Sequence, residues 1–185
     1  LNGVLPHVRK HPGKVAYGTS GVGSIHHLAF ATLAGRANLE MTHVPFKSSG
    51  QSTPAMIAND VQVLFTAYGA MAPHVRAGKA VLLAVASPQR APQSPEVPSF
   101  AEAGVAGVNL LPAVGLLAPA GTPKAVVDSL AQLARQALNH PESLKRLESL
   151  GIDPVANSPE AYAAQLAADV VYFAEAVRLS GARQR

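Results

Sequence analysis

The residues best suited to chemistry form a glycine-rich stretch near the start of the chain. Residues 17–24 read Tyr-Gly-Thr-Ser-Gly-Val-Gly-Ser and join a short apolar run to a helical pattern. Gly18, Gly21 and Gly23 allow positive φ and a close approach of the backbone, and Ser24 is a good helix N-cap. Backbone N–H groups would converge at the positive end of a helix dipole, which favours an anion by about 0.3–2 kcal/mol. The stretch therefore predicts capture of a carboxylate or phosphate.

The spacing of this stretch matches neither of two familiar nucleotide-binding loops. The chain has no G-x-x-x-x-G-K-[ST] run, and its G-x-x-G-x-G order differs from the dinucleotide fingerprint G-x-G-x-x-G. An ordinary connecting loop therefore remains the alternative to a ligand site at this point.

Signals for catalysis or metal binding are weak. His26 and His27 are adjacent, so on a helix they point about 100° apart and do not chelate one ion well. The chain has no G-x-S-x-G elbow and no paired carboxylates near the expected strand ends. We expect no metal, no cofactor and no catalytic residue, with an α/β enzyme that uses His27 as a general base kept as a rival.

Composition excludes several classes of protein. With 48% hydrophobic and 14% charged residues, the 185-residue chain is globular. The formal charge of +4 is scattered and tryptophan is absent, so we expect no nucleic-acid partner. The lack of cysteine excludes disulfides and thiol catalysis. Because residue 1 is leucine, we expect the chain to be cut from a longer one, in which a signal peptide upstream would not be visible here.

The elements that must position the glycine-rich stretch alternate between strands and helices, which predicts a mainly parallel α/β sheet. The expected strands are Val15–Tyr17, Met41–Phe46, Val61–Thr66 and Val81–Ala86. The expected helices are Ser24–Ala34, one that opens at Thr53-Pro54 with Pro54 as its first residue, and Met71–Ala77, which ends at Gly78.

The second part of the chain is predicted to be mostly helical. A proline-rich loop at 88–98 precedes a capping box formed by Ser99 and Glu102. A further strand is expected at Val114–Ala118. Helices are expected to open at Thr122-Pro123 and Ser158-Pro159, with a shorter helix around Leu144, Leu147 and Leu150.

Ligands of α/β sheets bind beyond the carboxyl ends of the strands, so the residues after each strand are the candidates. Here they are hydroxyls, glycines, an aromatic and one lysine, in residues 19–24, 45–49 and 66–68. Such a set can hold an anion but offers no evident general base.

Five ordered blocks make the chain similar to a known family. They read Y-G-T-S-G-V-G-S-I-H-H-L, H-V-P-F-K, A-P-H-V-R-A-G-K-A-V-L-L-A-V-A-S, V-P-S-F-A-E-A-G-V and G-L-L-A-P-A-G-T-P. From about residue 10 to 180 the chain resembles the Bug-type, TctC-like substrate-binding proteins of tripartite tricarboxylate transporters.

The resemblance implies a periplasmic solute-binding protein of the type II, Venus-flytrap fold, which captures a small carboxylate and passes it to membrane transporter subunits. Residues 1–110 would form the α/β second lobe, with its parallel-rich sheet. Residues 111–185 would supply a hinge strand and C-terminal helices that in the family cover the first lobe.

The resemblance also implies a set of ligand-binding residues around the cleft. They are Thr19, Ser20, Gly21, Val22, Gly23, Ser24, His27, Pro45, Phe46, Lys47 and Thr66. Many members carry an acidic or amide residue after the third strand, where this chain has Thr66-Ala67. That difference argues against recognition of an amine.

Most of the family's first lobe is expected to be missing from this chain. The apolar stripes on residues 123–177 would then be exposed to a degree that monomers rarely tolerate. We therefore expect either a homodimer through these helices or their rearrangement onto the remaining lobe. A module for effector sensing or dimerisation, without a transport role, is the alternative function.

Overall fold

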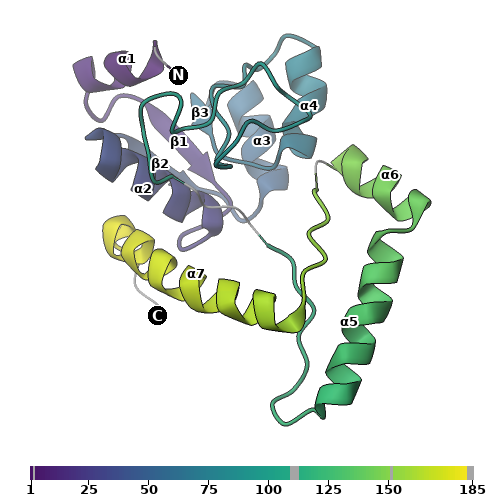
Figure 1. Cartoon of the computed structure of the whole chain (residues 1–185). Helices are drawn as coiled ribbons and strands as arrows, with labels where there is room; N and C mark the ends of the chain where they lie inside the picture. The colour runs from purple at the N-terminus through teal and green to yellow at the C-terminus, as the bar shows by residue number, and fades with distance from the viewer. Residues whose placement is uncertain (2, 109–112, 151, 183–185) are drawn as a thin grey trace. The chain divides into compact units, whose positions relative to one another are not determined.

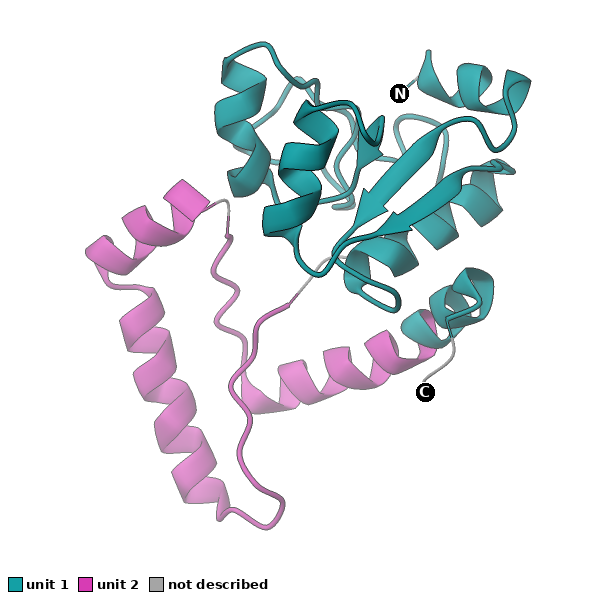
Figure 2. Ribbon diagram, turned by 180° about the vertical axis from the view of Figure 1, so that it is seen from behind, with its two compact units in different colours: residues 1–112, 173–185 teal, residues 113–172 magenta. Residues whose placement is uncertain are grey.

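The computed structural model describes residues 1, 3–108, 113–150 and 152–182 (Figure 1). It divides into two compact units, residues 1–112 with 173–185 and residues 113–172 (Figure 2). The helices are α1 (Val4–Lys10), α2 (Ile25–Ala37), α3 (Ser49–Ile57), α4 (Tyr68–Arg76), α5 (Lys124–Leu138), α6 (Pro141–Leu150) and α7 (Pro159–Ser180). The strands are β1 (Ala16–Thr19), β2 (Thr42–Pro45) and β3 (Val63–Leu64).

The first unit is built on a parallel sheet with strand order β2-β1-β3. In register, Tyr17 of β1 lies opposite His43 of β2 and Val63 of β3. The order follows from βαβ crossovers, because α2 joins β1 to β2 and α3 joins β2 to β3. The predicted α/β class with a parallel sheet is confirmed.

Successive side chains of β1 point to opposite faces of the sheet, so each face of β1 packs against different residues. The ring of Tyr17 stacks on Phe30 of α2 with centroids 4.2 Å apart. At Gly18, on the opposite face, an added Cβ would lie 3.1–3.2 Å from side chains of Phe46, Val61 and Leu64. The central strand is therefore packed tightly on both faces.

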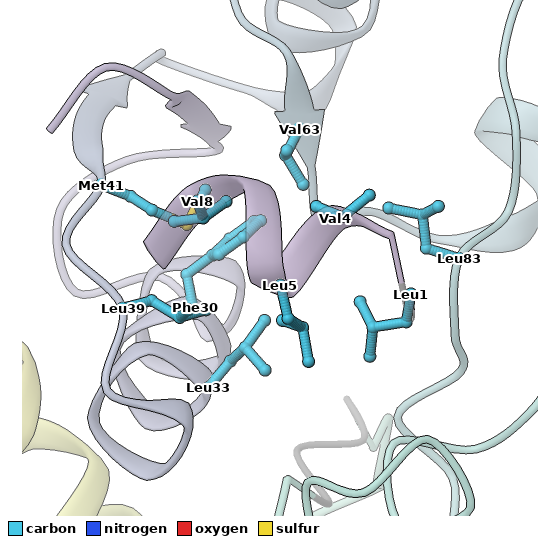
Figure 3. A pocket seen from close by; sticks show the side chains of 10 residues that line it. All are labelled: Leu1, Val4, Leu5, Val8, Phe30, Leu33, Leu39, Met41, Val63 and Leu83. Carbon is cyan, nitrogen blue, oxygen red and sulfur yellow. The ribbon is translucent and has the colours of Figure 1, made fainter. Parts of the chain in front are cut away.

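A seven-residue helix, α1, precedes the sheet and was not among the sequence predictions. It buries Leu5 and Val8 against α2 and the sheet. Figure 3 shows the apolar side chains around a residual gap of about 20 Å³. This volume suits about one water, and apolar cavities of this kind stay dry, so it is a packing gap rather than a ligand site.

Two predicted strands are wrong. Residues 81–86 form only one parallel bridge, between Val85 and Ser99, and residues 114–118 are extended without strand pairing. Both segments have β-branched or leucine runs, but a strand needs a neighbouring backbone to complete its hydrogen bonds. Among the described residues no such neighbour pairs with Val114, whose side chain is 97% exposed.

The predicted helix start at Thr53-Pro54 is also wrong. Helix α3 begins at Ser49, with Ser48 as its N-cap, so Pro54 lies inside the helix. The Gln51 side chain explains the earlier start, because its Oε1 accepts the Lys47 N–H at 3.1 Å, much as the glutamine of a capping box reaches back. The ends of the three strands differ from prediction by one or two residues: β1 begins one residue later and ends two residues later, β2 is one residue shorter at each end, and β3 is two residues shorter at each end.

Two predicted helix starts and one predicted capping box are confirmed. Ser24 caps α2, its hydroxyl accepting the His27 N–H at 3.3 Å. Ser158 caps α7 by accepting the Ala161 N–H at 3.1 Å. Ser99 and Glu102 form the reciprocal bonds of a capping box, although the segment makes hydrogen-bonded turns rather than a helix.

The second unit consists largely of α5, α6 and the first part of α7. None of the residues of α5 or α6 is buried. Exposed ion pairs join Lys124 to Asp128 and to Glu160, at 2.8 and 3.5 Å. Across the described residues, no helix is both long and apolar enough to cross a membrane.

Candidate functional site

The turn between β1 and α2 has the geometry that the glycines predicted. Gly21 and Gly23 have φ values of +129° and +76°, which side chains rarely adopt. The Ser24 hydroxyl donates to the Gly21 carbonyl at 2.7 Å and, as the N-cap, fixes the turn to the start of α2. Thr19, at the end of β1, is fully buried, whereas Val22 at the tip is 65% exposed.

Several backbone donors of the turn are open. Within the described residues, no hydrogen-bond acceptor is found for the N–H groups of Val22, Ile25 and His26. The first turn of α2 holds no acidic residue that would neutralise the helix dipole. The turn therefore presents unsatisfied donors and partial positive charge, as an anion requires.

Two histidines stand behind the turn. The rings of His27 on α2 and His43 on β2 stack with centroids 4.1 Å apart and planes 5° apart. His27 is buried, and its Nδ1 accepts the Gly23 N–H at 3.1 Å. His43 Nε2 lies 2.8 Å from Thr19 Oγ1, which in turn accepts the Gly21 N–H at 3.3 Å. Each imidazole thus supports one glycine of the turn.

Burial makes all three histidines near the turn hard to protonate. It lowers the pKa of His26 and of His27. The pKa of His43 is lowered to about 4, mainly by burial and further by the neighbouring His27. His26 Nδ1 lies 2.8 Å from Ser20 Oγ, so the third imidazole also holds a residue of the turn.

The loop after β2 lies beside the turn, as predicted. Pro45 is opposite Thr19 in the sheet register, and the Phe46 N–H donates to the Thr19 carbonyl at 3.0 Å. A Cβ on Gly21 would lie 3.4 Å from the Phe46 carbonyl oxygen. Lys47 is exposed, and its backbone N–H is the donor to Gln51.

Thr66 is not placed in contact with the turn by any interaction between described residues. It follows β3, and its buried hydroxyl has no hydrogen-bond partner among the described residues. Its neighbour Phe65 approaches the start of α2, with its ring 6.3 Å from that of His26.

Sequence reasoning missed His43 as a site residue. His43 opens the H-V-P-F-K block and lies two residues before Pro45. Because side chains alternate along a strand, His43 and Pro45 lie on the same face of β2. The block does not show which residues of β1 lie beside His43, because the register between strands depends on the tertiary fold.

The alternative role of His27 as a general base finds little support in this geometry. Its Nδ1 already accepts the Gly23 N–H, and the residue is only 6% exposed. None of the ion pairs among the described residues includes His27. A carboxylate that would orient and charge the imidazole is thus not paired with it.

Comparison with known proteins places the chain in a family. The sequence model described as "Tripartite tricarboxylate transporter family receptor" matches residues 1–177. A "UPF0065 protein in tcbD-tcbE intergenic region" from Pseudomonas sp. (strain P51) is 36% identical over 161 residues, which are 86% of this chain and 48% of that protein. A "UPF0065 protein in gbd 5'region" from Cupriavidus necator is 30% identical over 173 residues, 94% and 52% of the two chains.

Solved structures share the fold. One described as "Structure of a periplasmic transporter" superposes with a TM-score of 0.80 at 32% identity, covering 95% of this chain and 58% of the other. "R. palustris Rpa4515 with adipate" gives 0.76 at 25% identity, covering 96% and 60%. MatC from Rhodopseudomonas palustris "with bound malate" gives 0.69 at 26% identity, covering 98% and 61%.

The chain spans about half the length of these curated relatives and about 60% of the solved structures. The resemblance seen in the five sequence blocks and the predicted periplasmic-binding-protein fold are both confirmed. On the match over residues 1–177, this chain belongs to the tripartite tricarboxylate transporter receptor family.

Proposed function

We propose that this chain is the carboxylate-binding part of an extracytoplasmic solute receptor. The observation that carries the proposal is the turn at residues 19–24 together with the first turn of α2: among the described residues the N–H groups of Val22, Ile25 and His26 have no hydrogen-bond acceptor, and the first turn of α2 holds no acidic residue. Family membership and relatives solved with adipate and malate support it. The chain would hold its ligand without transforming it.

The proposed ligand is a small dicarboxylate. Adipate and malate, named for two relatives, share two carboxylates and lack an amine. In this chain the residues near the turn are hydroxyls, imidazoles held neutral and exposed Lys47, and Thr66-Ala67 follows β3. Neutral donors with one nearby cation suit a carboxylate better than an ammonium group.

We further propose a periplasmic location and membrane subunits of a tripartite transporter as partners. Both follow from the family description and from relatives described as periplasmic. One carboxylate would be held by the turn and by the Pro45–Lys47 loop, with Thr66 bordering the site.

Calorimetric titration of the chain with malate and adipate tests the binding proposal. We expect measurable affinity for at least one of them and a loss of about fivefold in Ser24→Ala, because the lost cap and the lost bond to Gly21 free the turn by about 1 kcal/mol. Ser149→Ala, at an exposed serine that bonds only within α6, is the matched control. Equal affinity of Ser24→Ala and the control would contradict the assignment of the turn.

A second candidate function, assembly through the C-terminal helices, is favoured by one observation. Large apolar side chains are exposed along α5, α6 and α7: Val126, Leu130, Leu133, Leu144, Leu150, Leu166, Val170, Val171 and Val177. We propose that these side chains pack in a homodimer, since exposed apolar area of this kind marks contact surfaces. Light scattering of the chain over a range of concentrations measures this association.

A further inference from the structure

The contact between His27 and Gly23 occupies one donor of the proposed anion site. Gly23 is exposed and lies at the tip of the turn, yet its N–H is given to the buried His27 Nδ1 at 3.1 Å. The other supported glycine, Gly21, gives its N–H to Thr19 Oγ1. A carboxylate bound by the turn would compete with both acceptors.

The Gly23 bond fixes the protonation state of His27. A ring nitrogen that accepts a hydrogen bond carries no proton, so the neutral ring has its proton on Nε2. Protonation of Nδ1 would turn this acceptor into a donor and break the bond to Gly23. In the empty site, His27 is therefore held neutral by the same contact that fills the Gly23 donor.

The groups around His27 reinforce this state. His43 on β2 stacks on the ring of His27, with centroids 4.1 Å apart. A positive charge on one ring would therefore repel a positive charge on the other. Tyr17 of β1 also stacks on His43, with ring centroids 4.9 Å apart, and burial raises the pKa of the Tyr17 phenol, so it stays neutral. His26 is the adjacent titratable group on α2 and is bonded to Ser20. Among the described ion pairs, none places a carboxylate against either stacked ring.

We propose that His27 is a displaceable occupant of the anion site and that binding of a carboxylate is linked to uptake of one proton by the His27–His43 pair. The inference rests on the proposed function of the turn. The ligand takes the Gly23 N–H, the freed Nδ1 accepts a proton from solvent, and the resulting imidazolium faces the bound negative charge. His43 is a positioning residue, which holds Thr19 and stacks on His27 in the empty state.

Coupling between proton uptake and carboxylate binding determines how the binding affinity depends on pH. The carboxylate raises the pKa of the pair in the complex above its value in the free chain, so the complex binds more protons than the free chain. Affinity then increases as the pH falls from about 7.5 to about 6, by up to about tenfold per pH unit for one proton. A site made only of backbone donors would show no change in this range, where the carboxylates of the ligand stay ionised.

Calorimetry with malate and adipate in two buffers of different ionisation enthalpy, near pH 6, counts the protons. We expect uptake approaching one proton per bound ligand for the chain and for His140→Gln, a control at an exposed histidine of the second unit. In His27→Gln, the amide oxygen can accept the Gly23 N–H but does not titrate, so binding should persist without proton uptake.

The outcomes separate this inference from the function on which it rests. Binding without proton uptake overturns the linkage and leaves the carboxylate receptor intact. Failure of both probes to bind overturns the receptor proposal and the linkage together. Imidazole ¹⁵N shifts give a readout that needs no variant: burial lowers the pKa of free His27, so its ring should stay in the Nε2–H form below the ordinary pKa of about 6.5, and titration at that ordinary value would refute the inference.

Discussion

At the scale of single residues, the site depends on neutral imidazoles. His43 Nε2 lies 2.8 Å from Thr19 Oγ1, and His27 Nδ1 accepts the Gly23 N–H, so both imidazoles support the turn; His27 is buried and His43 is half-buried. A buried, neutral histidine costs stability when the pH falls, because the unfolded chain takes up the proton that the folded chain resists. The same residues that support the turn are therefore expected to lower the stability of the fold as the pH falls.

We expect the free energy of unfolding to decrease as the pH falls from about 6.5 towards 4. In that window the unfolded His43 is protonated, whereas the folded residue, with a pKa of about 4, is not. Urea unfolding at several pH values should give a flatter profile for His43→Gln than for the unchanged chain. His140→Gln should behave as the unchanged chain does, and parallel profiles for all three would contradict the role of His43.

At the scale of elements, β1 carries most of the positioning. It is the central strand, it ends at Thr19 where the turn begins, and its alternating residues meet α2 on one face and the Phe46 and Leu64 side chains on the other. Helix α2 begins at the cap that closes the turn. The proposed anion site thus lies where the central strand meets α2, which buries more residues than any other described helix.

Substitution of Gly18 by alanine tests this packing. The added Cβ would lie 3.1–3.2 Å from three side chains, tighter than ordinary contact, so neighbours must shift. We expect a loss of about 1–3 kcal/mol in the free energy of unfolding, the usual cost of overpacking a core. Gly50→Ala, in α3, has only Ser48 Oγ nearby at 3.5 Å and serves as the control. Equal stability of the two variants would show that β1 has room to adjust.

At the scale of the whole molecule, the two units differ in how they bury apolar residues. The first has a core that includes Val8, Phe30 and Val61, whereas α5 and α6 bury none of their residues. The chain spans about half the length of the curated relatives. Val126, Leu130 and Leu133 leave apolar area exposed on α5, and this exposed area is the surface on which the homodimer proposal rests.

A charge placed in this exposed apolar area should weaken assembly. Leu133 is 59% exposed on α5, and a glutamate there would have to lose its hydration in an apolar interface. We expect Leu133→Glu to raise the dissociation constant of the dimer at least about tenfold by analytical ultracentrifugation. Gln132→Glu adds the same charge at an exposed polar residue of the same helix and should leave the constant unchanged. A chain that is monomeric at all concentrations would contradict the dimer proposal.

The sequence by itself determined the local features of this protein. The glycines, Ser24 and the apolar run before them specified the turn and the cap of α2, because φ preference and capping depend on a few adjacent residues. The ordered blocks also identified the family. Only the tertiary structure decided which segments found a partner: residues 81–86 and 114–118 have the composition of strands, yet most of their backbone lacks strand pairing. It also brought His43 against His27 and Thr19, because contacts between distant residues depend on strand register, which a single sequence does not encode locally.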